Sequence, residues 1–227
     1  MTAEQKITAL SIAQKQYFLF DMDGTLVDST WLWDTYLNTF LVRYQCSADA
    51  EARQQFDILP LRESAEYIAK RYALPMNGMQ TFSLWSSEIE VIYRTKLKLK
   101  PGAEKYLRFL KDRGKKLALA TVNHENLALA CLENNQILHL FDAVFCGDHT
   151  ELDKSDPAFY LQAMAQIGAE AEKTLLFEDT LSAVLTAGKI PLDTIVIEDQ
   201  ASIKNRPELM KQAVLYIKNF ESPLLYR

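Results

Sequence analysis

Short, mostly apolar runs recur along the chain, and each ends at a polar, acidic or glycine residue. They are YFLF before Asp21, KLALA before Thr121, AVFC before Gly147, TLLF before Glu178, TIVI before Glu198 and VLYI before Lys218. Apolar runs of this length are typical of strands that are buried on both faces of a parallel sheet. We therefore predict parallel strands that end at these residues.

Helical patterns lie between several of these runs. GAEKYLRFLKDRG is entered through Pro101 and closed by Gly114, and DPAFYLQAMAQIG is closed by Gly168. Strands that alternate with helices indicate an α/β fold, so we expect a Rossmann-like, doubly wound parallel sheet.

The pattern changes between Thr30 and Lys98. This stretch holds one glycine, Gly78, and the segments TWLWDTYLNTFLVRY, LRESAEYIAKRYA and LWSSEIEVIYRTK have helical periods. An all-helical insert directly after the first strand explains the change. We predict a catalytic core of residues 1–28 and 99–227 that carries a helical cap of residues 29–98.

Composition narrows the class of protein. Of the 227 residues 48% are hydrophobic, which is enough for a sizeable core, and the formal net charge is −5 with no basic stripe. We therefore expect no nucleic-acid partner. The three cysteines, Cys46, Cys131 and Cys146, are widely spaced and read as reduced thiols. The first sixteen residues lack the apolar core of an export signal, and no apolar stretch reaches transmembrane length. A cytoplasmic protein with no membrane partner is expected, as a monomer or small homo-oligomer.

Acidic residues follow the first predicted strand in the segment DMDGTLVDS. Asp21 and Asp23 lie two residues apart, and Gly24 allows a tight turn. The carboxyl ends of parallel strands are where ligands bind in open α/β sheets. An Asp-Gly pair alone is most often a plain turn, but here an apolar strand precedes it and three further polar features lie at or near strand ends.

Those three features are Thr121 at a strand tip, Lys154 before a helix, and Glu178 with Asp179 after another strand. Singly, they could be a strand end or helix cap, a solvated lysine and a loop start. Together they supply a hydroxyl, a cation and carboxylates, which suit a phosphate and a hard divalent cation with oxygen ligands.

A divalent cation has a physical reason to be present. Like-charge repulsion opposes the attack of a carboxylate on a phosphate group, and a cation relieves it. Asp21 and Asp179 can supply ligands for Mg²⁺, which takes few protein carboxylates. A zinc site is not expected, because His124, His139 and His149 lack ligand spacing.

The motifs of this sequence resemble those of a known family. DMDGTLVDS, Thr121, Lys154 with Pro157, and FEDT are similar, in order and separation, to the four motifs of the haloacid dehalogenase-like superfamily. The layout is similar to the branch of β-phosphoglucomutase and phosphoglycolate phosphatase, which carries a helical cap between the first two motifs. Because Asp23 is present, the resemblance favours phosphoester chemistry over dehalogenation.

The resemblance implies a role for each matching residue. Asp21 would attack phosphorus and form an aspartyl-phosphate, and Asp23 would act as general acid and then general base. Mg²⁺ would be bound by Asp21, by the backbone carbonyl of Asp23 and by Asp179, with Glu178 as a ligand or as a partner of a metal-bound water. The phosphoryl oxygens would be held by Thr121, Asn123 and Lys154.

The sequence also departs from the family pattern. Ala183 replaces a glycine behind the fourth motif and Pro191 follows soon after, so we expect the next helix to be shortened or shifted. Val122 stands where a small polar residue is common, so a phosphate contact there would come from the backbone.

In the cap, Arg62 matches an arginine that binds a distal phosphate in the mutase branch, although it could be an ordinary surface residue. Trp33 replaces a histidine that assists a sugar hydroxyl there, and it could instead belong to the packing of the cap. This replacement favours a phosphatase acting on a small phosphate monoester, such as a sugar phosphate or phosphoglycolate-like metabolite. A phosphomutase and a non-catalytic member of the family are the alternatives.

Overall fold

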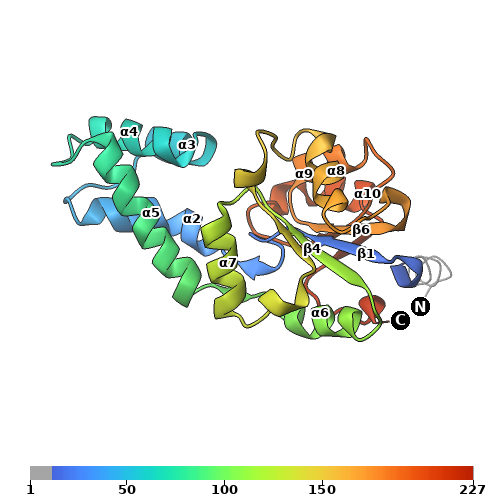
Figure 1. Ribbon diagram of the computed structural model, residues 1–227. Coiled ribbons are helices and arrows are strands. Elements are labelled where there is room, and N and C mark those ends of the chain that lie inside the picture. The colour runs from blue at the N-terminus through green and yellow to red at the C-terminus, as the bar shows by residue number, and fades with distance from the viewer. Residues whose placement is uncertain (1–11, 227) are drawn as a thin grey trace. The chain divides into compact units, whose positions relative to one another are not determined.

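The computed structural model describes residues 12–226, and a six-stranded parallel sheet forms the centre of the larger of its two units (Figure 1). In spatial order the strands are β5 (Ala143–Phe145), β4 (Lys116–Ala120), β1 (Tyr17–Phe20), β6 (Thr174–Glu178), β7 (Asp193–Ile197) and β8 (Leu215–Ile217). All six predicted strands are present, and the doubly wound α/β fold is confirmed. The chain builds one half of the sheet outward from β1 through β4 and β5, and then the other half from β6. Ligands bind at such a change of direction, at the carboxyl ends of the strands.

Helices cover both faces of this sheet. In Figure 1, α8, α9 and α10 lie together on one face and α6 lies on the other. The α-helices of this unit whose full extent is described are α6 (Ala103–Lys111), α7 (Glu125–Asn134), α8 (Pro157–Ala165), α9 (Leu181–Ala187) and α10 (Arg206–Gln212). As expected from Ala183 and Pro191, α9 is short, with seven residues.

Two hydrophobic layers hold the helices to the sheet. On one face Leu19 and Leu176 pack against Phe159 of α8. On the other face the rings of Phe20 and Phe177 stack with their centroids 4.7 Å apart. Alternate side chains of a strand point to opposite faces, so β1 and β6 contribute to both layers. Each fully buried side chain of this size stabilises the fold by about 1.5–3 kcal/mol.

A separate helical unit is formed by Trp31–Lys96, whereas the sheet unit runs to Thr30 and resumes at Leu97. Its helices are α2 (Thr30–Val42), α3 (Ala50–Ile58), α4 (Leu61–Arg71) and α5 (Gly78–Thr95). Edge-to-face contacts of Trp85 with Tyr36, Phe40 and Phe56 form its core. The sequence periods predicted three of these helices but not α3, which buries only Ala52 and Phe56 and therefore has a weak apolar pattern.

The chain passes between the two units twice, and these two crossings pair with each other. Outgoing strand β2 (Val27–Asp28) and returning strand β3 (Lys98–Leu99) are antiparallel, with Val27 opposite Leu99. Among the described residues, no helix is long and apolar enough to cross a membrane. The prediction that the first sixteen residues carry no export signal falls mostly outside the residues that the structure describes.

Candidate active site

Asp21 lies directly after β1, at the carboxyl end of the sheet, and is 4% exposed. Its backbone N–H donates to the carbonyl of Phe177 at 3.0 Å, which fixes the start of the loop. The turn that follows needs Gly24, whose φ is +78° and whose missing Cβ would lie 2.6 Å from Oδ2 of Asp179. Glycine therefore serves both the backbone conformation and the close approach of this carboxylate.

Three buried carboxylates converge at this point. Oxygen atoms of Asp21, Glu178 and Asp179 all lie within 4.8 Å of one another. Glu178 Oε2 accepts hydrogen bonds from the backbone N–H groups of Asp179 at 2.8 Å and Thr180 at 3.0 Å, and from Thr180 Oγ1 at 3.1 Å. Thr25 Oγ1 donates to Asp179 Oδ1 at 3.1 Å. These bonds fix the carboxylates of Glu178 and Asp179 at the carboxyl end of β6.

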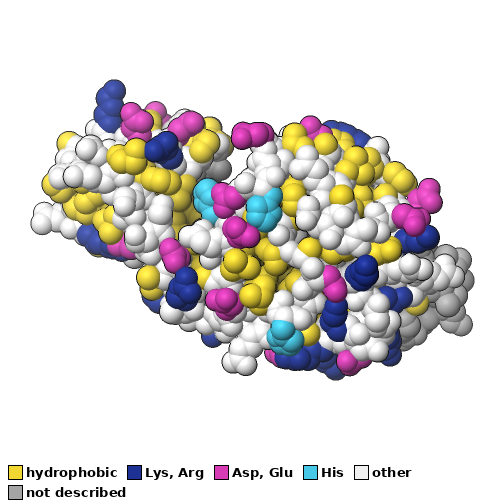
Figure 2. All heavy atoms as spheres, in the orientation of Figure 1, with side chains coloured by type: hydrophobic (Ala, Val, Ile, Leu, Met, Phe, Trp, Pro, Cys, Tyr) yellow, Lys and Arg dark blue, Asp and Glu magenta, His cyan; other side chains and the backbone are white. Residues whose placement is uncertain are grey.

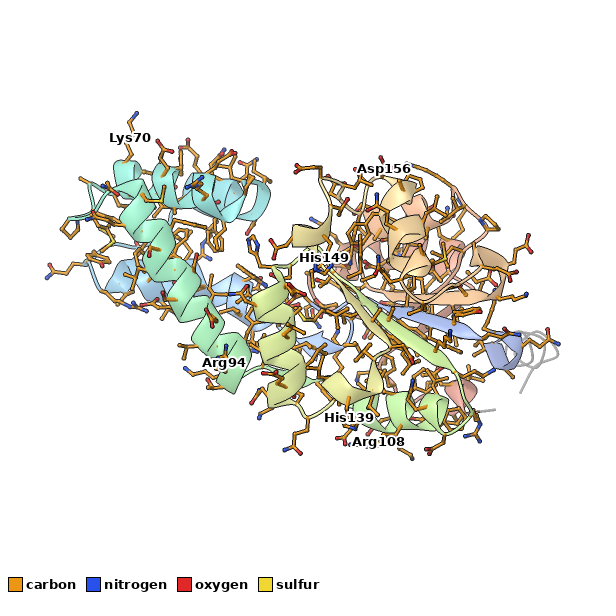
Figure 3. All side chains as sticks on the ribbon, viewed as in Figure 1. Lys70, Arg94, Arg108, His139, His149 and Asp156 are labelled. Atoms are coloured by element: carbon orange, nitrogen blue, oxygen red, sulfur yellow. The ribbon has the colours of Figure 1, made fainter. Side chains whose placement is uncertain are left out.

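Lys154 brings a positive charge to the same cluster. Its Nζ donates to Asp21 Oδ1 and to Glu178 Oε1. The residue lies just before α8, where Asp156 Oδ1 accepts from the N–H of Ala158 at 2.8 Å and caps the helix. Asp156 is labelled in Figure 3 at the start of α8. The helix start therefore fixes the segment that carries the lysine.

The charges in the cluster shift one another's ionisation. Burial raises the pKa of Asp21 to about 7, with Lys154 opposing the shift and Glu178 adding to it. The pKa of Asp179 is also raised, chiefly by burial and then by Glu178 and Asp21. Although burial disfavours the charged form of Lys154, the carboxylates of Asp21 and Glu178 raise its pKa above the ordinary value. The lysine stays charged, while the raised pKa values of Asp21 and Asp179 mean that these two carboxylates tend to hold protons.

This donor set fits a hard divalent cation. It offers only oxygen atoms, and one lysine cannot balance three buried carboxylates, so a further positive charge would stabilise their ionised forms. Neither histidine nor cysteine belongs to the cluster, and within the described part of the chain no other group of acidic, histidine and cysteine ligands is close enough to hold a metal. Asp21, Glu178 and Asp179 are the residues that could hold Mg²⁺.

Residues 121–123, here called the phosphate loop after the role that the sequence resemblance implies for Thr121 and Asn123, lie beside Asp23. Asn123 Nδ2 donates to Asp23 Oδ2 at 2.6 Å, and the backbone N–H of Asn123 donates to Thr121 Oγ1 at 3.2 Å. The carbonyl of Asn123 accepts from the N–H of Gly147 at 3.0 Å. A pocket of about 480 Å³ is lined by members of this loop and of the carboxylate cluster, by Asp23 and by Lys154. It is large enough for a phosphate group and a small leaving group.

A short 3₁₀ turn after β5, Gly147–His149, supports the far side of this loop. Asp148 Oδ2 accepts from the backbone N–H of Glu125 at 2.7 Å, and its Oδ1 lies 2.7 Å from His124 Nδ1. His149 Nε2 is 3.3 Å from Glu125 Oε1. Histidines lie beside acidic side chains here in Figure 2, and Figure 3 labels His149. The N-terminus of α7, which has no side-chain cap of its own, is thereby capped by Asp148.

The structure brings seven of the nine predicted site residues together at one edge of the sheet. They are Asp21, Asp23, Thr121, Asn123, Lys154, Glu178 and Asp179. The other two, Arg62 and Trp33, belong to the helical unit. There the guanidinium of Arg62 lies over the Phe82 ring, 5.7 Å from its centroid, and Trp33 packs against Phe56 with centroids 6.4 Å apart.

Three residues that support the site were not predicted from the sequence: Thr25, Thr180 and Gly147. Both threonines stand inside quoted motifs, DMDGT and FEDT, and they hold the carboxylates of Asp179 and Glu178. Their place beside the acidic residues was a usable signal. Gly147 ends the AVFC strand, but its contact with the phosphate loop depends on the packing of β5 against β4 and leaves no pattern in the sequence.

Comparison with known proteins agrees with this fold. The chain is 27% identical over 178 residues to a phosphorylated carbohydrates phosphatase of Thermotoga maritima, covering 78% of this chain and 82% of the relative. A T. maritima structure assigned as a β-phosphoglucomutase superposes with a TM-score of 0.78 at 25% identity, covering 92% of this chain and 96% of the other. The structure of CbbY from Rhodobacter sphaeroides with phosphate has the same fold, with a TM-score of 0.72 at 21% identity and coverage of 92% and 96%. Residues 18–197 match the model of the haloacid dehalogenase-like hydrolases, and the chain belongs to this family.

Proposed function

We propose that this protein is a Mg²⁺-dependent phosphatase that hydrolyses a small phosphate monoester, either a sugar phosphate or a phosphoglycolate-like metabolite, through an aspartyl-phosphate on Asp21. The observation that carries the proposal is the cluster of Asp21, Glu178 and Asp179 around Lys154, with Asp23 and the phosphate loop beside it. The activity named for the T. maritima phosphatase supports a phosphorylated carbohydrate as the class of substrate.

The reaction needs two carboxylates in different roles. A carboxylate oxygen of Asp21 attacks phosphorus, the bond from phosphorus to the leaving oxygen breaks, and Asp23 gives that oxygen a proton. Water then attacks the phosphorus of the aspartyl-phosphate while Asp23 takes a proton from it, which releases inorganic phosphate and restores Asp21. The hydrogen bond from Asn123 Nδ2 to Asp23 Oδ2 orients the acid.

Charge around the phosphoryl group is balanced by the residues that line the pocket. Lys154 and the phosphate loop, with the Thr121 hydroxyl, bind the phosphoryl oxygens as the negative charge shifts. Asp21 and Asp179, with the backbone carbonyl of Asp23 and with Glu178 in support, would hold a Mg²⁺ ion, which would supply electrostatic stabilisation of the phosphoryl group. Binding the cation also favours the ionised form of Asp21, whose pKa burial raises to about 7.

The helical unit is proposed to act as a cap, with residues 29–98 as the inserted domain. A cap that closes over the pocket would exclude water and add contacts to the leaving group. Arg62 is its candidate for binding a distal anionic group, since its guanidinium is exposed and makes no ion pair among the residues that the structure describes. Trp33 is half-buried and offers part of an apolar ring to a nonpolar leaving group.

The proposal is tested by phosphate release from a panel of phosphate monoesters, with and without Mg²⁺. Asp21→Asn should abolish turnover, because an amide cannot attack phosphorus. Asp112→Asn, the same change on an exposed residue at the end of α6, should leave turnover unchanged. Full activity in Asp21→Asn, or no phosphate release from any monoester, would overturn the proposal.

A phosphomutase is the second candidate, favoured by the similarity to the structure assigned as a β-phosphoglucomutase. In that case the phosphoryl group of Asp21 passes to a substrate hydroxyl instead of to water. Isomerisation of a sugar phosphate that depends on a bisphosphate, without net release of phosphate, would identify a mutase. Trp33, in place of the histidine of that branch, favours the phosphatase.

A further inference from the structure

One buried carboxylate joins both chain crossings between the two units. Asp199 follows β7 by two residues and is 6% exposed. Its Oδ1 accepts a hydrogen bond from Thr30 Oγ1 at 2.5 Å, and its Oδ2 accepts one from Lys100 Nζ at 2.8 Å. Thr30 is the first residue of α2 on the outgoing crossing, and Lys100 follows β3 on the returning one. A single side chain therefore holds two segments that are 70 positions apart in the sequence.

The returning crossing is held at further points. Lys100 is 7% exposed, its Nζ also donates to the carbonyl of Glu198 at 2.8 Å, and its backbone N–H donates to the carbonyl of Leu26 at 2.8 Å. A buried ammonium group is costly unless it is paired and hydrogen-bonded, so Lys100 depends on the carboxylate of Asp199. The pairing of β2 with β3 then ties the two crossings to each other.

Asp199 lies just after β7, the strand that neighbours the end of β6 where Glu178 and Asp179 are found. β7 pairs with β6, and in their register Glu178 is opposite Val196, three residues before Asp199. The crossings are therefore fixed to the same edge of the sheet that carries the candidate metal ligands. In general, domain closure is absorbed by a few residues at the ends of elements, and the fixed points beside them set the pivot.

We propose that Asp199 is a positioning residue that clamps the outgoing and returning crossings to the catalytic sheet and so sets the pivot about which the helical unit closes. The proposal rests on the proposed function, in which that unit is a cap over a phosphatase site. Loss of one arm of the clamp would loosen the connecting ribbon, meaning β2 and β3, and would make closure less favourable. Chemistry in the carboxylate cluster itself would remain possible.

Thr30→Val tests the outgoing arm without leaving a buried charge unpaired, because the Lys100–Asp199 pair is kept. Thr39→Val is its matched control on the same helix, because among the described residues the hydroxyl of Thr39 donates only to the carbonyl of Thr35, one turn earlier in that helix. Thr30→Ser keeps a hydroxyl that can reach Asp199 and should rescue the wild-type behaviour. None of these residues belongs to the carboxylate cluster or the phosphate loop.

Two measurements are made on the full chain. Amide hydrogen exchange should speed up about tenfold or more in the connecting ribbon of Thr30→Val, as expected when a hydrogen bond to a charged group is lost. The kcat/KM for a phosphate monoester identified in the substrate panel should fall about tenfold, chiefly through KM, while the Mg²⁺ affinity of the metal-free protein stays unchanged. Thr39→Val and Thr30→Ser should match the wild type in both.

The outcomes separate the clamp from the proposed function. Faster exchange with unchanged kinetics would overturn the positioning role, and unchanged exchange would overturn the clamp itself. If the wild type hydrolyses no phosphate monoester, the proposed function fails, and the exchange measurement still decides whether Asp199 holds the crossings. A fall in Mg²⁺ affinity in Thr30→Val would mean general disruption of the site and would also overturn the proposal.

Discussion

Gly147→Ala should disable the phosphate loop without touching any candidate catalytic side chain. A Cβ at this position would lie 2.3 Å from the carbonyl oxygen of Val122 and 3.0 Å from its carbonyl carbon. Both atoms belong to the backbone, so no side chain can turn away. To reach an ordinary separation of ~3.4 Å, the loop or β5 would have to move by about 1 Å. The hydrogen bond from the N–H of Gly147 to the carbonyl of Asn123 would be strained by the same shift.

A displacement of about 1 Å at a phosphate-binding backbone can cost ~100-fold in rate, which corresponds to about 2.7 kcal/mol of transition-state stabilisation. We expect kcat for phosphate release to fall by about this factor in Gly147→Ala, with about 1–3 kcal/mol lost from the free energy of unfolding through overpacking. Steady-state kinetics and urea unfolding measure the two effects.

Gly188→Ala is the matched control, because the nearest atoms to its Cβ are 3.5 and 3.6 Å away and its φ is −66°. It should keep wild-type turnover. Wild-type kcat in Gly147→Ala would refute the reasoning, since it would mean that this loop either relaxes at no cost or does not hold the phosphoryl group.

Three further predictions concern the carboxylate cluster. Gly24→Ala should weaken Mg²⁺ binding at least tenfold, because the φ of residue 24 is +78° and the new Cβ would lie 2.6 Å from the Asp179 carboxylate. Calorimetry measures the Mg²⁺ affinity, and an unchanged affinity would contradict this contact. Burial raises the pKa of Asp21 to about 7, and Mg²⁺ should bind the ionised form. The Mg²⁺ affinity should therefore rise about tenfold from pH 6 to pH 8, with release of a proton on binding. Asp21→Asn should lose this pH dependence of the Mg²⁺ affinity. Lys154→Met leaves the buried carboxylates without their positive partner, so the metal-free protein should lose about 3 kcal/mol of unfolding free energy in urea titrations at pH 8. The loss should be smaller at pH 5, where Asp21 and Asp179, whose pKa values are raised, take up protons.

The sheet and most of the site could be predicted from the sequence because the signals for them lie in short, continuous stretches of the chain. Each buried strand is a short apolar run, and the catalytic candidates of the sheet unit other than Lys154 stand at or near the end of such a run, as Asp21 does after YFLF and Glu178 does within TLLFE. In a parallel sheet those ends share one edge, so adjacency along the strands becomes adjacency in space. This rule needs no knowledge of which strands pair.

Contacts between segments that are distant in sequence could not be predicted in the same way. Asp199 bonds Thr30 and Lys100 because β7 lies next to β6 and both crossings return to that edge, and no residue type or spacing encodes this. Gly147 is required by the approach of one backbone to another. The α3 helix was missed since its two buried residues, Ala52 and Phe56, make too weak a period.

Burial of the carboxylates also determines how the site would respond to a bound cation. Asp21, Glu178 and Asp179 face one lysine, and the raised pKa values of Asp21 and Asp179 mean that the metal-free cluster reduces its excess negative charge by holding protons. A protonated Asp21 would be a poor nucleophile, so near neutral pH the metal-free protein would hold a large share of its proposed nucleophile in the inactive form. Protons and a divalent cation thus compete for the same negative charge. Removing the cation should therefore lower turnover more strongly at pH 6 than at pH 8, beyond the loss of its direct contact with the phosphoryl group.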